Sequence, residues 1–175
     1  MIKKEIALYS FDELDEETKE KLIKEDMELQ REFYIEDCLY EYLEEEATSL
    51  LNSHFENVKE LKLLYDFSCS QGSGLLTEFT FTFKDELIKV KQNPNNHWYT
   101  YASNFILDFE DEESISDEEE QELRNKIIKV NKELEHIGYD FINDDDFYRE
   151  CSTLYLEDEK LFFKDGTIYY DNMND

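Results

Sequence analysis

Residues 61–83, LKLLYDFSCSQGSGLLTEFTFTF, decide the fold. Their apolar side chains recur at every second position on both sides of a glycine-bearing loop, Gln71–Gly74. Successive side chains of a β-strand point to opposite faces, so this period predicts two strands that each present one apolar face. The segment therefore predicts a β-hairpin, which we expect at the centre of a sheet.

Further strands are predicted after this hairpin. Residues 87–90 indicate a short third strand and residues 99–109 a long fourth one, with a turn at Asn93–Asn96 between them. Near the end of the chain, Asp165–Gly166 separates two short apolar runs. An Asp-Gly pair in that setting predicts a terminal hairpin with a two-residue turn.

Four segments carry apolar residues at helical spacing. Ser116 and Glu119 have the spacing of a capping box, and so do Ser10 and Glu13, beside which Asp15 offers a second N-cap. Helices are expected at about residues 12–30, 31–55, 116–142 and 147–156.

These elements predict an α+β fold, an antiparallel β-sheet meander with long helices packed on its apolar face. With 1 Pro and 4 Gly, the chain has no stretch with the composition of a flexible linker. We therefore expect a single acidic α+β domain over residues 1–175.

The charge of the chain is unusual for a folded protein of this length. It holds 46 Asp and Glu against 18 Lys and Arg, a formal net charge of −28, yet 40% of its residues are hydrophobic, enough for a core. Exposed carboxylates repel phosphates, so direct binding to nucleic acid or to an anionic membrane is not expected. Three possibilities remain: a basic protein surface as partner, metal cations, or a charge that serves solubility alone.

The N-terminal residues and the three cysteines indicate a cytoplasmic protein. Two lysines near Met1 precede no long apolar run, and no segment has the length of an apolar membrane span. Cys38, Cys69 and Cys151 are odd in number and far apart, which is typical of free thiols in a reducing compartment.

No motif of the chain predicts catalysis, a cofactor or a dedicated metal site. The three histidines have no metal-ligand spacing to one another or to a cysteine. Asp144–Asp146 lacks the glycine and spacing of a calcium loop and can instead cap the last helix. We expect a protein that is not an enzyme, although an enzyme that uses buried carboxylates or an activated Cys69 stays an alternative.

Residues 110–120 are the candidate partner-binding site, because eight of eleven positions carry a carboxylate. Such a density can meet arginines and lysines that otherwise contact DNA phosphates, as can the acids that face outward between residues 12 and 46. The alternative is that these acids serve helix capping and solubility. The predicted partner-binding residues are Glu110, Asp111, Glu112, Glu113, Asp117, Glu118, Glu119 and Glu120.

Three short motifs resemble a widespread family of small acidic phage and prophage proteins. Residues 11–20, FDELDEETKE, are similar to the family's FDELSEEAKE opening, and Phe163–Gly166 is similar to its closing F-x-x-DG. Ser68–Gly74 keeps the Gln-Gly of the family's S-x-QGDGASF loop but lacks the acid and the Ala-Ser-Phe that follow. The resemblance implies an origin in a mobile element and little chemistry, since most members have no assigned activity.

By size and charge the chain is also similar to phage anti-CRISPR and antirestriction inhibitors. We therefore expect a phage-encoded inhibitor of a bacterial defence nuclease or CRISPR effector, which acts in the host cytoplasm on a basic nucleic-acid-binding surface. An antitoxin-like or regulatory module that neutralises a basic toxin or host factor is the alternative. The aromatic side chains exceed what a core of this size needs, so some are expected at an interface with the target or in a homodimer; the candidates are Tyr34, Tyr40, Tyr42, Trp98, Tyr99 and Tyr101.

Overall fold

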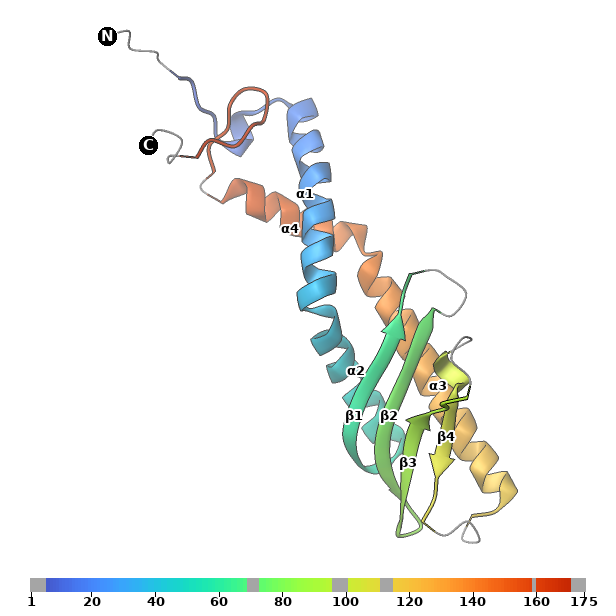
Figure 1. Cartoon of the computed structure of the whole chain (residues 1–175). Helices are drawn as coiled ribbons and strands as arrows, with labels where there is room; N and C mark the ends of the chain where they lie inside the picture. Colours follow the sequence, from blue (N-terminus) through green and yellow to red (C-terminus); the bar gives the residue numbers. More distant parts are fainter. Residues whose placement is uncertain (1–5, 69–72, 96–100, 111–114, 159, 171–175) are drawn as a thin grey trace. The chain divides into compact units, whose positions relative to one another are not determined.

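The computed structural model describes residues 6–68, 73–95, 101–110, 115–158 and 160–170. Its elements, shown in Figure 1, are η1 Phe11–Glu13, α1 Glu16–Asp37, α2 Leu39–His54, β1 Glu56–Asp66, β2 Gly74–Phe83, β3 Glu86–Gln92, η2 Tyr101–Ser103, β4 Phe105–Asp108, α3 Asp117–Ile142 and α4 Asp145–Glu157.

Contacts group the chain into two compact units. Unit 1 consists of residues 1–36 and 144–175, and unit 2 of residues 37–143. Unit 2 carries 24 Asp and Glu against 9 Lys and Arg, and unit 1 carries 22 against 9. The excess of acid is therefore a property of each unit and is not confined to one segment. The single domain over residues 1–175 stays a prediction.

Unit 2 contains the sheet, whose strands follow one another in the order β1-β2-β3-β4, all antiparallel. Helices α2 and α3 cover one face of this meander, and Figure 1 looks onto the other face. The α+β fold and the meander are thus confirmed. The fourth strand is shorter than predicted, because η2 occupies residues 101–103 and β4 begins only at Phe105; residues 99 and 100 lie outside the described part.

The β2–β3 connection is a two-residue turn that the sequence analysis did not predict. Lys84 and Asp85 have φ values of 51° and 67°, and Phe83 pairs with Glu86 across them. Two successive residues with positive φ form a type I′ turn, which matches the twist of the strands. The sequence does not predict this turn, because Lys-Asp stands where a type I′ turn usually has Asn-Gly.

Strand β1 is one edge of the sheet and is irregular in its first half. Asn57 and Glu60 both have a φ of 54°, and the register to β2 shifts between Glu56 and Lys59 and again between Lys59 and Lys62. From Lys62 to Asp66 the pairing is continuous. These are β-bulges, which bend and twist an edge strand.

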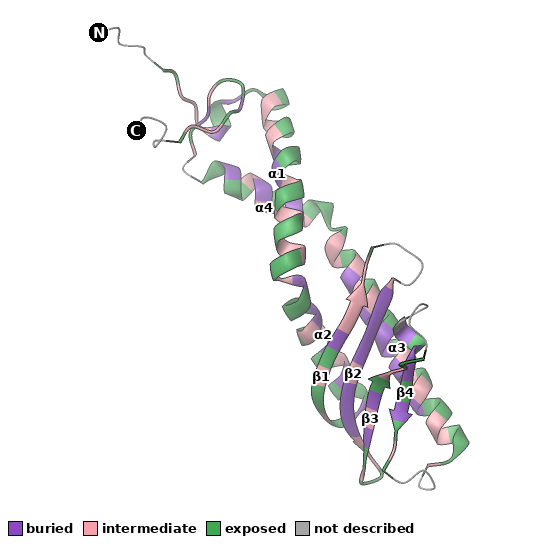
Figure 2. Cartoon of the chain, viewed as in Figure 1, coloured by how far each residue is buried: buried purple, intermediate pink, exposed green. Residues whose placement is uncertain are grey.

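The core of unit 2 lies between the sheet and the two helices, as the buried residues in Figure 2 indicate. Phe55 brings the end of α2 against the rings of Phe79 and Phe81 of β2, with centroids 5.5 and 4.7 Å away. Other buried side chains of the two layers are Leu39, Leu43, Ala47, Leu51, Leu63, Leu75, Ile88, Val90, Phe105, Leu107, Leu123, Ile127, Val130 and Leu134.

Two polar side chains that are fully buried in this core, Asn131 and Thr77, are hydrogen-bonded to each other. The Asn131 amide oxygen of α3 accepts hydrogen bonds from the Thr77 N–H (3.1 Å) and the Thr77 hydroxyl (2.7 Å). Its amide nitrogen donates to the Ala102 carbonyl at 3.0 Å. Asn131 therefore fixes α3 to β2 and η2 at the same time.

The starts of three helices use the predicted caps, but one boundary differs. Ser116 caps α3 and Asp144 caps α4. The box of Ser10 and Glu13 closes the short η1, while Asp15 accepts from the Thr18 N–H as α1 begins. The first two helices separate at Cys38, not near residue 31, since the periodic run contains no glycine or proline to mark a break.

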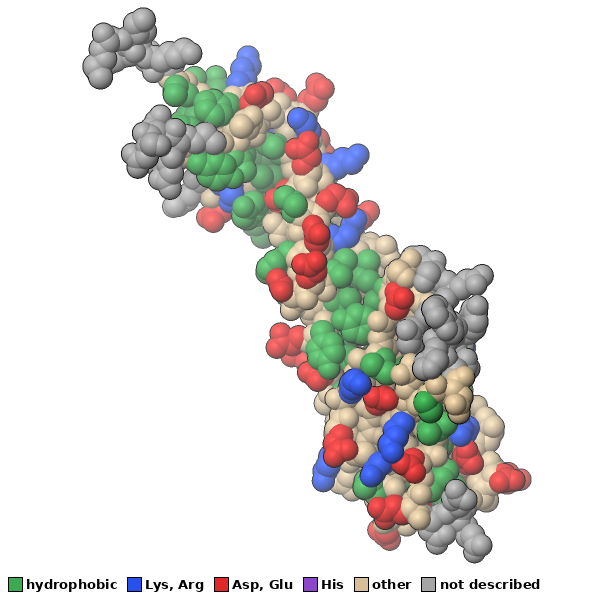
Figure 3. Space-filling view, viewed as in Figure 1, with side chains coloured by type: hydrophobic (Ala, Val, Ile, Leu, Met, Phe, Trp, Pro, Cys, Tyr) green, Lys and Arg blue, Asp and Glu red, His purple; other side chains and the backbone are tan. Residues whose placement is uncertain are grey.

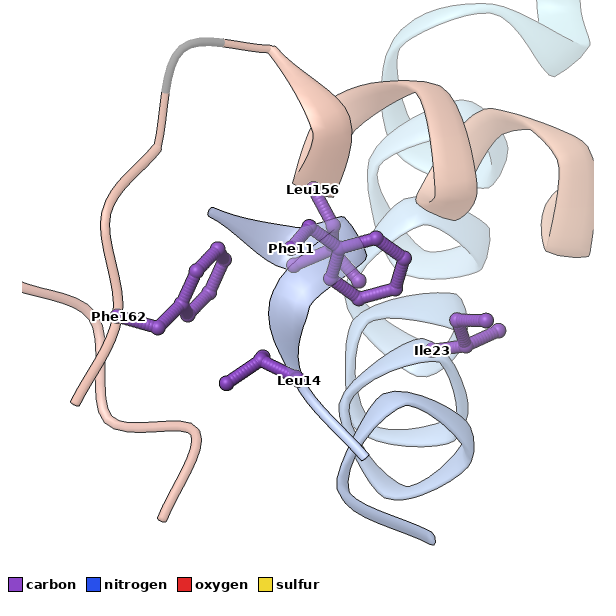
Figure 4. Packing of buried hydrophobic residues seen from close by; sticks show 5 residues of the cluster. All are labelled: Phe11, Leu14, Ile23, Leu156 and Phe162. Atoms are coloured by element: carbon purple, nitrogen blue, oxygen red, sulfur yellow. The ribbon is translucent and has the colours of Figure 1, made fainter. Parts of the chain in front are cut away.

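Unit 1 has a small core to which both ends of the chain contribute. Figure 4 shows Phe11 and Leu14 near the N-terminus, Ile23 of α1, Leu156 of α4 and Phe162 of the C-terminal segment gathered together. Helices α1 and α4 are also linked by the ion pairs Arg31–Asp145 and Arg149–Glu20.

The predicted terminal hairpin is present in a reduced form. Phe162 bridges Ile168, and the Phe163 N–H donates to the Thr167 carbonyl at 2.8 Å. The turn therefore has three residues, 164–166, and not the predicted two. Gly166 has a φ of 86° and packs against Leu22, where a Cβ would lie 3.3 Å from the leucine side chain.

Candidate partner-binding surface

The predicted acidic segment is only partly available to a partner. Glu110, Asp117 and Glu118 are exposed. Asp111, Glu112 and Glu113 lie outside the described residues. The remaining two, Glu119 and Glu120, are half-buried and already have cationic neighbours.

Glu119 completes the cap of α3 and joins it to the β2–β3 turn. Its carboxylate accepts from the Ser116 N–H at 3.2 Å and lies 2.5 Å from the Lys84 ammonium. Glu120 lies 2.7 Å from Arg124, whose guanidinium stacks over the Phe105 ring. Both carboxylates therefore serve the structure of unit 2, as the capping alternative expects.

Glu119→Gln is expected to lower the melting temperature at pH 7. The Lys84 ammonium first, and then hydrogen bonds from Ser116, hold the pKa of the Glu119 carboxyl below its ordinary value. A carboxyl whose pKa is lowered by folding stabilises the fold above its unfolded-state pKa and loses this effect as the pH falls through the folded value. The difference in melting temperature from the parent protein should shrink between about pH 5 and pH 3.

Thermal unfolding followed by circular dichroism measures this difference. Glu118→Gln is the control, because Glu118 is exposed in the same helical turn and pairs with no base among the described residues. A gap for Glu119→Gln that stays constant down to pH 3 contradicts the ion-pair explanation.

Helix α2 carries several carboxylates that have no cationic neighbour among the described residues. Its sequence, LYEYLEEEATSLLNSH, contains no Lys or Arg. Leu39, Leu43, Ala47 and Leu51 form its buried face. Helical geometry then places Glu41 and Glu45 on the far side and Glu44 and Glu46 on the two flanks. Within the described part of the chain, none of these four lies within 4.0 Å of a Lys or Arg.

The other two long helices differ in this respect. In α1, Lys19 pairs with Glu16, and in α3, Lys126 pairs with Glu122 at 2.8 Å. Such pairs three or four residues apart stabilise a helix, whereas like charges at that spacing, as in Glu41 and Glu45, destabilise it by a similar amount, about 0.2–0.5 kcal/mol. Helix α2 thus retains a local repulsion that α1 and α3 relieve in part.

A shallow hollow lies beside these acids. It has a volume of about 520 Å³ and is lined by Glu44, Glu45, Thr48 and Ser49 of α2 and by Leu61 of the edge strand β1. Carboxylate and hydroxyl oxygens are acceptors that suit the guanidinium of arginine or the ammonium of lysine. We call Glu41, Glu44, Glu45 and this hollow the α2 surface.

Periodicity predicts these glutamates on an outer helix face, whereas acid density favours residues 110–120. A signal for the α2 surface was present, since residues 32–58 contain eight carboxylates and not one Lys or Arg. Acid density alone favoured residues 110–120, because it does not reveal which carboxylates a base will neutralise.

The open face of the sheet carries bases, but they are balanced by acids. Lys62 lies 3.3 Å from Glu78, and Lys91 lies 2.5 Å from Asp108, where its ammonium lowers the pKa of the aspartate. Figure 3 shows basic and acidic side chains side by side over the strands. This face therefore presents little net charge beside the α2 surface.

Side chains that could bind a metal or act as nucleophiles are scattered over the described residues. Within the described residues, no three His, Cys, Asp or Glu side chains gather so that they could hold a metal ion. Cys38 and Cys151 are free, half-buried thiols, and His54 and His136 are exposed; Cys69 and His97 lie outside the described residues. Among the described helices, none combines the length and apolar character that a membrane crossing requires.

Comparison with known protein families, with curated proteins and with solved structures finds no match to the chain. The fold and the site define a class in structural terms: an α+β protein with a four-stranded meander and a helix, α2, whose glutamates have no cationic neighbour in the part of the chain that the structure describes.

Proposed function

We propose that the protein is a non-enzymatic inhibitor that binds, in a fixed stoichiometry, a basic nucleic-acid-binding surface of another protein. The class of target we propose is a bacterial defence nuclease or CRISPR effector, inhibited by a phage-encoded protein. The observation that carries this proposal is the α2 surface, where a helix exposes several carboxylates and no base.

The charge density of α2 supports mimicry of nucleic acid. Residues 41–46 carry four carboxylates over about 7.5 Å of helix axis. That is one charge per about 2 Å, close to the one per about 1.7 Å of duplex DNA. Arginines arranged for phosphates can bind carboxylates through two parallel hydrogen bonds, so a groove built for DNA suits this surface.

Displacement of labelled duplex DNA from purified RNA-guided and restriction nucleases tests the proposal. We expect one equivalent of the protein to displace the DNA from at least one nuclease at low salt, with an affinity that falls steeply between about 50 and 200 mM salt. If the folded protein displaces DNA from none of them, the proposal is wrong. It is also wrong if far less than one equivalent of the protein already gives full displacement.

An antitoxin-like module that neutralises a basic toxin or host factor is the second candidate. Exposed apolar side chains favour it, because Leu29 and Phe33 of α1 are 63% and 52% exposed and a DNA groove offers little to bury them. Duplex DNA separates the two functions: it competes with the protein for a nuclease groove but does not compete for a basic toxin without a DNA site.

A further inference from the structure

Helix α1 exposes an apolar pair in unit 1. Leu29 and Phe33 lie one helical turn apart, and more than half of each side chain is open to solvent. Thr18 and Leu22 lie eleven residues, or about three helical turns, before Leu29 and Phe33, so all four residues form one stripe on the same face of α1. The first half of that stripe packs against Gly166 of the terminal hairpin. The second half, Leu29 and Phe33, stays exposed.

The surroundings of this pair are acidic. Glu25, Glu32 and Glu36 follow one flank of it on the helix, and among the described residues neither Glu32 nor Glu36 has a base within 4.0 Å. Along the same flank a hollow of about 380 Å³ is lined by Glu28, Arg31, Glu32, Ile35 and Glu36. We call Leu29, Phe33, Glu32 and Glu36 the α1 surface.

These properties determine the chemistry of the occupant. A second copy of the chain brings the same carboxylates to the contact, and like charges placed together are unfavourable. A basic partner gains from the acids, and an apolar stripe covers Leu29 and Phe33. Two anchors one turn apart match the spacing of side chains on a second helix packed along the first.

We propose that the α1 surface docks a basic amphipathic helix, with apolar residues on Leu29 and Phe33 and with Lys or Arg on Glu32 and Glu36. This site lies in the unit that does not contain α2. It goes beyond the proposed function and does not depend on it.

A synthetic 18-residue peptide of leucine and lysine tests the proposal, with leucines at positions i, i+3, i+4 and i+7. A peptide of the same composition in scrambled order controls for charge alone. Binding is measured by fluorescence anisotropy on protein with the changes Glu41→Lys, Glu44→Lys and Glu45→Lys, so that the α2 surface cannot attract either peptide.

We expect the amphipathic peptide to bind at least tenfold more tightly than the scrambled one. Leu29→Ser combined with Phe33→Ser should remove this preference, and Glu32→Gln with Glu36→Gln should weaken the amphipathic peptide severalfold. Leu154→Ser is the matched control, because Leu154 of α4 is 61% exposed, nearly as much as Leu29; it should change nothing.

Three outcomes overturn the proposal: equal binding of both peptides, equal loss in the Leu154→Ser control, or a dimer in sedimentation that the Leu29 and Phe33 changes abolish. The last assigns the surface to a second copy. Circular dichroism establishes that each variant is folded. Displacement of DNA from nucleases reports separately on the α2 surface, so a failure here leaves that result unaffected.

Discussion

If the proposed function holds, replacing Glu41, Glu44 and Glu45 by lysine is expected to slow association with an inhibited nuclease by about 10- to 1000-fold at low salt, the range over which electrostatic steering acts. The three changes convert the most negative part of α2 into a positive one that a basic groove repels. They should leave the fold intact, because Glu41 and Glu45 lie opposite the buried face of α2 and make no ion pair among the described residues. Stopped-flow association rates at several salt concentrations measure the effect, and the salt dependence should flatten.

Net charge must be separated from position in this experiment. A second triple variant, Glu122→Lys, Glu133→Lys and Glu135→Lys, changes the total charge equally. These positions lie on α3, which already carries Arg124, Lys126, Lys129 and Lys132. We expect a much smaller effect on the rate. An equal effect from both triple variants means that total charge matters and that the α2 surface is not the site.

A third variant tests residues 110–120. The changes Glu110→Lys, Asp117→Lys and Glu118→Lys reverse the charge of the exposed carboxylates near the start of α3. Loss of binding here, with none in the α2 variant, transfers the site to this segment. Some loss of stability is expected from positions 117 and 118, since a cation in the first turn opposes the helix dipole by about 0.3–1 kcal/mol.

Asn131→Leu is expected to lower the free energy of unfolding by about 2–4 kcal/mol, a large part of the 5–15 kcal/mol typical of a domain. Leucine has the same number of side-chain heavy atoms and the same branching as asparagine, but it is larger and cannot bond the Thr77 N–H or the Ala102 carbonyl. Both groups then remain buried without a partner, which costs more than the lost hydrogen bonds themselves. Urea unfolding should show a lower midpoint with an unchanged slope.

Asn125→Leu is the control on the same helix. Asn125 is exposed and accepts one hydrogen bond from Gln121 at 3.1 Å, so its loss should cost less than about 0.5 kcal/mol. Equal midpoints for the two variants mean that Asn131 does not fix α3 to the sheet.

Much of the fold follows from periodicity. The hairpin of residues 61–83 and the long helices were predictable because a period of two or 3.6 is a property of the local sequence. The Lys84–Asp85 turn was not, since Lys rarely adopts positive φ and the pair lacks the usual Asn-Gly or Asp-Gly signal. Asn131 was equally invisible, because a polar residue in a helical run gives no sign that it will be buried.

Of the candidate site, the sequence could predict the acidic character but not which carboxylates stay without a base. The net charge of −28 favours a cationic partner from composition alone, with solubility as the alternative. The pairing of Glu119 with Lys84 depends on a turn 35 residues earlier in the chain, so only the folded structure removes Glu119 from the available carboxylates. The lack of bases in residues 32–58 is the sequence feature that best locates the α2 surface.

The bulges of β1 have a consequence for how the protein can be used in a cell. A strand from a neighbouring molecule finds a regular row of backbone groups only from Lys62 to Asp66, because the first half of β1 is kinked at Asn57 and Glu60. Irregular edges of this kind discourage fibre growth and aggregation. The inhibitor proposed above would be consumed one for one and would have to accumulate to at least the level of its target, so an irregular β1 edge would lower the risk of edge-to-edge pairing at that concentration.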